Sequence, residues 1–168
     1  MTEAWLQGPV DGIAPVLQPV AHALVQARED VRQLAPAMTG EALWSDPGGG
    51  AAPAGYHLLH LVTAMDRLLT YARGELLSAE QLATLKAEGG PHPELDGPAL
   101  TALVEAAIAR ALDQVRGTDP EIILDARRVG RSGLPSTVLG LLFHTAEHTT
   151  RHVGQFITTS KIVNKTAP

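Results

Sequence analysis

Four long stretches of this sequence carry apolar side chains at the three- and four-residue spacing of an α-helix, and this pattern constrains the fold more than any other feature. Prolines and glycines separate the stretches, so each stretch can form one helix before the chain turns. The predicted helices cover residues 13–34, 53–73, 97–115 and 136–163. We therefore predict an all-α protein, a four-helix bundle in which residues 1–168 form a single domain.

Composition supports a packed core. Hydrophobic residues make up 45% of the 168 residues and charged residues 18%, which is typical of a globular protein. Aromatic residues are only 4%, while leucine and alanine abound, so we expect a core of small and branched aliphatic side chains.

Prolines and capping residues set the predicted helix boundaries. Pro15 and Pro19 suit a first helical turn, where a missing N–H costs nothing, so the first regular helix is expected to begin between them. Pro36 ends that helix, and Asp96 is a candidate N-cap for the third long helix.

The connections differ in character. A short extra helix is predicted over residues 78–87, and a loop over residues 41–50, where Trp44 is expected to anchor the loop to the bundle. Residues 121–134 combine an apolar run with glycines, which predicts a long extended connection before the last helix. A connection of this length is a candidate lid or interface segment.

The charge balance and the absence of cysteine exclude several classes. The net charge is −5 and there is no dense cluster of lysine or arginine, which disfavours nucleic acid as a partner. Without cysteine there are no disulfides, thiolate ligands or thiol nucleophiles, so imidazole and carboxylate remain as strong metal ligands. The first residues lack the segments of a signal peptide and no apolar run reaches the length of a membrane span, so we expect a cytoplasmic protein with no membrane partner.

Five of the seven histidines form two clusters on predicted helices. His144, His148 and His152 follow one another at four-residue intervals, which places them on one helix face, and His57 and His60 lie on the second long helix. A catalytic zinc or nickel site can use three imidazole ligands and keep an open position. We expect His148 and His152 to bind a divalent metal with His60 opposite, while His57 and His144 orient ligands, bind substrate or substitute as ligands.

The sequence disfavours a protease interpretation of the last histidine cluster. Residues 144–148 match the H-x-x-E-H pattern of inverzincin proteases. The third ligand of those enzymes is a glutamate well downstream, and no Asp or Glu follows Glu147. Glu147 is expected on the flank of the metal face or in an ion pair. Serine hydrolases are disfavoured because the G-x-S-x-G motif is absent.

Two segments, residues 56–71 and 144–155, resemble the DinB-like (DinB/YfiT) superfamily of metal-binding four-helix proteins. The family pattern has one histidine on the second long helix and an H-x-x-x-H pair on the last helix, often followed by a small residue and glutamine. The positions that match this pattern are His60, His148, His152 and Gly154-Gln155. The sequence departs from the pattern in its extra histidines, His57 and His144, which leaves open which histidines bind the metal directly.

The resemblance implies an up-down-down-up bundle, frequent homodimers and a divalent metal such as zinc or nickel. Characterised relatives include transferases and isomerases that use low-molecular-weight thiols, and some hydrolases. We therefore expect a small-molecule substrate, with a low-molecular-weight thiol as a candidate co-substrate.

The leading functional hypothesis is a metal-dependent enzyme, a transferase or hydrolase, in which the metal activates a water or a thiol. Arg151 is a candidate contact for an anionic substrate group or for Glu147. One alternative is a non-catalytic, metal-stabilised stress-related bundle that binds a small molecule or a protein. Another is a structural bundle without metal.

Overall fold

The computed structural model describes the backbone of residues 2–166 and the side chains of residues 2–164. The helices are α1 (Gln18–Leu34), α2 (Gly40–Trp44), α3 (Ala54–Ala72), α4 (Ala79–Ala87), α5 (Gly97–Gly117) and α6 (Val138–Thr166). The strands β1 (Ala126–Val129) and β2 (Leu134–Thr137) form an antiparallel hairpin. Single 3-10 turns lie at Ala4–Leu6, Pro15–Leu17, Ala35–Ala37 and Pro120–Ile122.

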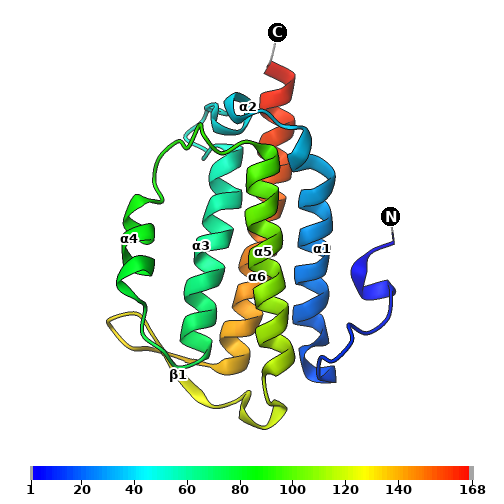
Figure 1. Ribbon diagram of the computed structural model, residues 1–168, viewed down its shortest axis with the longest axis vertical. Coiled ribbons are helices and arrows are strands. Elements are labelled where there is room, and N and C mark those ends of the chain that lie inside the picture. Colours follow the sequence, from blue (N-terminus) through cyan, green and yellow to red (C-terminus); the bar gives the residue numbers. More distant parts are fainter. Residues whose placement is uncertain (1, 167–168) are drawn as a thin grey trace.

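The four long helices form an up-down-down-up bundle (Figure 1). The helices α1 and α3 each pack against both α5 and α6, and the tightest pairing is between α3 and α6. Because α3 and α5 run in the same direction, residues 73–96 must carry the chain back along the bundle. This crossover contains α4, which stands beside α3 in Figure 1. The predicted all-α bundle and its short extra helix are confirmed.

The capping predictions agree with the structure. The helix α1 begins at Gln18, between Pro15 and Pro19, and Pro36 lies in the 3-10 turn that follows α1. The side chain of Asp96 accepts a hydrogen bond from the backbone N–H of Ala99 at 2.9 Å, which caps α5.

The core is aliphatic, as expected. The largest fully buried side chains include Leu24, Leu58, Leu61, Met65, Leu100, Ile108, Leu142 and Phe156. Two buried threonines on α6 keep their hydroxyls satisfied within the helix. Thr145 and Thr149 donate to the carbonyl oxygens of Leu141 and Thr145, each at 2.8 Å. Because these hydroxyls need no partner outside α6, the helix can bury the two threonines against the bundle. The histidines lie on another face of the same helix.

Two expectations about the connections need correction. The predicted loop over residues 41–50 contains the five-residue helix α2, whose N-cap Thr39 accepts from the N–H of Ala42 at 3.2 Å. The Trp44 indole N–H donates to the Leu95 carbonyl at 2.9 Å, which confirms its anchoring role. Turn formers on both sides of this short helix obscured it in the sequence.

The connection before the last helix is a hairpin, where an extended segment was expected. Gly130 and Gly133 supply positive φ angles of 67° and 60° at its turn, and the last helix begins after Thr137, two residues later than predicted. Arg127 donates to the carbonyl of Ala72, at the end of α3, at 2.8 Å. His60 lies twelve residues earlier on α3, about 18 Å along the helix axis, so the hairpin is not a lid over the histidines.

Within the described part of the chain, none of the helices combines the length and apolarity needed to cross a membrane.

Candidate metal centre

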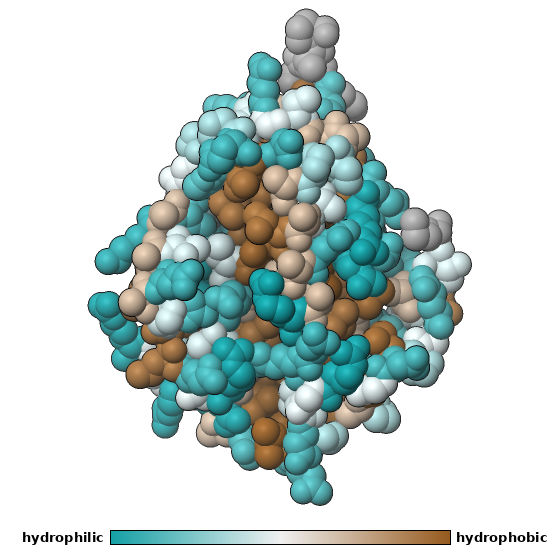
Figure 2. Space-filling model, in the orientation of Figure 1, coloured by the Kyte–Doolittle hydropathy of each residue, from teal (hydrophilic) through white to brown (hydrophobic). Residues whose placement is uncertain are grey.

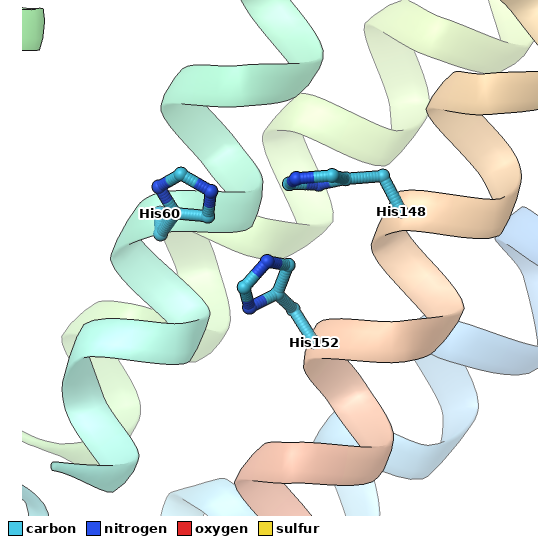
Figure 3. Close-up of side chains that lie close together, drawn as sticks. All are labelled: His60, His148 and His152. Atoms are coloured by element: carbon cyan, nitrogen blue, oxygen red, sulfur yellow. The ribbon is translucent and has the colours of Figure 1, made fainter. Parts of the chain in front are cut away.

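Three histidines from two facing helices converge at the middle of the bundle. His60 comes from α3, and His148 and His152 come from successive turns of α6 (Figure 3). One ligand atom from each lies within 4.8 Å of the others. The ring centroids of His152 lie 4.5 Å from those of both His60 and His148. The close packing of α3 against α6 thus brings together the three histidines that were predicted from the sequence as metal ligands.

The two α6 rings of this group are held neutral. Burial, followed by the charges of the neighbouring His60 and His144, lowers the pKa of His148 to about 4. Burial likewise lowers the pKa of His152 to about 3, with contributions from His148, His60 and His57. Both rings are therefore uncharged near pH 7, and each has one nitrogen whose lone pair can bind a cation.

His57 lies behind His152. Its side chain is buried, and its Nδ1 atom lies 3.2 Å from Nδ1 of His152. Burial, and then His60, lower the pKa of His57, so this pair is a contact between neutral rings in which one Nδ1 donates and the other accepts. When His152 donates, its Nε2 is left for a metal. His57 is therefore placed to orient His152.

His60 has a partner that the sequence interpretation missed. Its Nδ1 lies 2.7 Å from a carboxylate oxygen of Glu88, a residue only 7% exposed. Thr63 also donates to this carboxylate, and Arg67 approaches its other oxygen at 3.4 Å. On its other side His60 stacks on Tyr56, with 5.4 Å between ring centroids.

Only a weak sequence signal marks Glu88. It is the C-cap of α4, where the helix dipole disfavours a negative charge. An acidic residue at that position is therefore more easily explained by a tertiary partner than by the helix itself. No periodicity links residue 88 to residue 60, so the contact depends on the fold.

His144 and Arg151 lie at the rim of the histidine cluster, outside the group of three. The His144 side chain is 48% exposed, and its Nδ1 lies 3.4 Å from a carboxylate oxygen of Glu147. Arg151 donates to Glu147 from Nε at 3.0 Å. This hydrogen bond, ahead of the nearby charges, holds the pKa of Glu147 below its ordinary value. Glu147 is thus in the ion pair that was one of its expected roles.

The residues present suit a divalent cation. Three half-buried imidazoles, two of them neutral, provide the nitrogen ligands that zinc and nickel accept. Their ligand atoms, within 4.8 Å of one another, form a group that could hold one ion. Within the described residues this group offers three side chains that could hold an ion, and three protein ligands would leave coordination positions for other molecules.

Solved structures share this fold at low sequence identity. A conserved protein from Enterococcus faecalis is 18% identical with a TM-score of 0.71, covering 90% of this chain and 99% of the other. A DinB-like protein from Bacillus cereus is 12% identical with a TM-score of 0.64, covering 84% and 89%.

YfiT from Bacillus subtilis, described as a probable metal-dependent hydrolase with an unusual four-helix bundle topology, is 14% identical with a TM-score of 0.63, covering 92% and 91%. The comparison with curated protein sequences gave no significant match. The sequence profile of the DinB superfamily matches residues 23–156, most of the bundle and all three converging histidines. The chain belongs to the DinB superfamily.

Proposed function

We propose that this protein is a metal-dependent enzyme acting on a small molecule, with His60, His148 and His152 as the ligands of one divalent ion. The observation that carries this proposal is the convergence of three half-buried imidazoles within 4.8 Å, from two helices. The description of YfiT as a probable metal-dependent hydrolase supports it, although that protein shares only the fold at 14% identity.

Each residue around the centre has a distinct task in this proposal. A divalent metal, zinc or nickel, would supply Lewis-acid activation of a water or a low-molecular-weight thiol near neutral pH. His148 and His152 stay neutral at that pH and so keep their lone pairs available. His57, in contact with His152, would orient that ring, and Arg151, which pairs with Glu147 at the rim, would meet an anionic group of a substrate.

We favour hydrolysis over thiol transfer, because YfiT, one of the structural relatives, is described as a probable metal-dependent hydrolase. The thiol co-substrate and the homodimer are finer parts of the proposal and rest on the family resemblance alone. A metal-stabilised bundle without catalysis is the alternative. The link from the crossover to His60 through Glu88 favours it, because a metal held by His60 would also brace the fold.

The test begins with metal content. Purified protein reconstituted with zinc or nickel is expected to hold about one ion per chain by elemental analysis, and a His148→Ala/His152→Ala double variant is expected to hold none. The loaded wild type is then assayed on ester and amide substrates with and without added thiol. Turnover that the double variant lacks supports the enzyme, metal binding without turnover supports the alternative, and a wild type without metal refutes the site.

A further inference from the structure

We propose that Glu88 is a positioning residue of the metal centre, acting on His60. Its carboxylate fixes the ring of His60 so that Nε2 faces the other two histidines, and it fastens the crossover of residues 73–96 to the metal site. This inference rests on the proposed function, because it concerns how the metal ligand His60 is held.

The first argument is the burial of a charged group. Glu88 is 7% exposed, and taking a carboxylate out of water is costly unless donors surround it. Three donors do so, all on one face of α3 at successive turns. They are Nδ1 of His60 at 2.7 Å, the hydroxyl of Thr63 and the guanidinium of Arg67 at 3.4 Å. The carboxylate is therefore enclosed by a built polar site.

The second argument is the position of the hydrogen on His60. An ionised carboxylate only accepts hydrogen bonds, so the His60 nitrogen facing it must carry a hydrogen. When the ring is neutral, its lone pair is then on Nε2, the nitrogen left for the metal. A carboxylate behind a histidine ligand also increases the basicity of that ligand, which strengthens its bond to a cation.

The third argument comes from the crossover itself. Of residues 73–96, all of which are described, Glu88 alone is buried. The helix α4 has no buried side chain, and beneath it lies a groove of about 730 Å³ between α3, α4 and α5. Apolar residues in the groove, Leu59, Val62 and Leu103, stay partly exposed, and Figure 2 shows brown surface between α3 and α5. Glu88 is therefore the one buried side chain of the crossover, while Leu95 at its end packs partly buried against the core.

A helix placed only to connect α3 to α5 would be expected to bury a leucine against these groove residues. The crossover instead buries a carboxylate at a metal ligand. The crossover also makes polar contacts with α3 near the start of α4, where Gln81 donates to Asp66 at 2.6 Å and to Thr70 at 2.8 Å. Removing Glu88 is therefore expected to loosen the end of α4 and to release His60 at the same time.

The experiment compares Glu88→Gln, Glu88→Ala and the control Glu80→Gln in the full chain. Glu80 lies in the first turn of α4 and is exposed. Glu80→Gln therefore makes the same chemical change as Glu88→Gln, at a side chain that does not touch His60. Zinc affinity is measured by competition with a chromophoric chelator, and the coordination sphere by the visible spectrum of the cobalt-loaded protein. Circular dichroism confirms that each variant is folded.

We expect Glu88→Ala to weaken zinc binding by about 10- to 100-fold and to alter the cobalt spectrum. Glu88→Gln should have a smaller effect, because its amide oxygen still accepts from Nδ1 of His60. The control should match the wild type. In the wild type, zinc should also slow hydrogen exchange across residues 79–88, and in Glu88→Ala it should not.

The metal-free protein offers an independent readout. Nitrogen NMR of the histidine rings should place the hydrogen of neutral His60 on Nδ1 in the wild type and show a mixture of tautomers in Glu88→Ala. If the wild type binds zinc and Glu88→Ala binds it equally, with the same spectrum, the role of Glu88 is overturned while the proposed function stands. A wild type that binds no metal refutes the proposed function, and this inference with it.

Discussion

The inner and outer histidines of α6 share one helix and one spacing but differ in environment. His148 and His152 are half-buried against α3, and their pKa values are lowered to about 4 and about 3, chiefly by burial. His144, one turn earlier, has a side chain 48% exposed and an ionic partner in Glu147. The four-residue spacing sets which side chains share a face, and the packing of α3 sets which of them can reach a common ion.

The largest effect should come from replacing an inner histidine. His148→Ala or His152→Ala alone is expected to weaken zinc binding by more than about 100-fold, since the loss of a direct ligand should exceed the loss of a residue that only orients one. Calorimetric titration with zinc measures this. An equally large loss in His144→Ala would contradict the division between inner and outer residues.

The stability of the metal-free protein in acid should also distinguish the inner histidines, His148 and His152, from the outer one, His144. Folding lowers the pKa of His148 and His152 below 6.5. Between pH 6.5 and these lowered values, the two rings therefore bind more protons in the unfolded state than in the folded state. Their contribution to stability is full above pH 6.5 and is lost as the pH falls towards 4. The free energy of unfolding should drop by up to about 1.4 kcal/mol per pH unit for each ring.

Urea unfolding between pH 7 and pH 4 measures this dependence. The His148→Ala/His152→Ala variant should show a shallower decline than the wild type. His144→Ala should change the slope much less, because His144 lowers the pKa of His148 less than burial does. Identical slopes in the wild type and the double variant would show that burial does not hold these rings neutral.

An intermediate effect is expected at His57. His57→Leu keeps an apolar side chain of similar reach but removes the Nδ1 contact at 3.2 Å from His152. Zinc affinity should fall by about 10-fold, the lower end for a residue that orients a ligand, with little change in the urea midpoint. If affinity is unchanged, His57 is a packing residue and does not orient His152.

The smallest effects belong to the rim. Arg151→Ala removes the exposed ion pair with Glu147, so stability should change by less than about 1 kcal/mol and zinc affinity by less than twofold. Once a substrate is found, this variant should raise KM for anionic substrates more than for neutral ones. A uniform change across both substrate classes would remove Arg151 from substrate binding.

Local patterns explain what could be predicted from the sequence. The four long helices follow from the spacing of apolar residues and from caps such as Asp96. Both signals depend only on residues that are close to one another in the sequence. The pairing of His148 with His152 is also local, because a helix fixes it. The place of His60 opposite them was a hypothesis based on the second histidine cluster and supported by the family resemblance, since no local rule pairs α3 with α6.

Contacts between distant segments explain what was missed. Glu88 meets His60 only because the crossover folds back along α3, and the residues around it carry no periodic signal. The hairpin was missed because Arg127 and Arg128 interrupt the alternation expected of a strand, and its turn glycines resemble those of an irregular loop. These features depend on tertiary packing.

The most direct test of the central claim is a crystal structure of the zinc-loaded protein with anomalous diffraction data collected on both sides of the zinc absorption edge. The account predicts one anomalous peak, bonded to His60, His148 and His152, with His144 unliganded. A peak bonded to His144 and Glu147, or none near the three converging histidines, would contradict it.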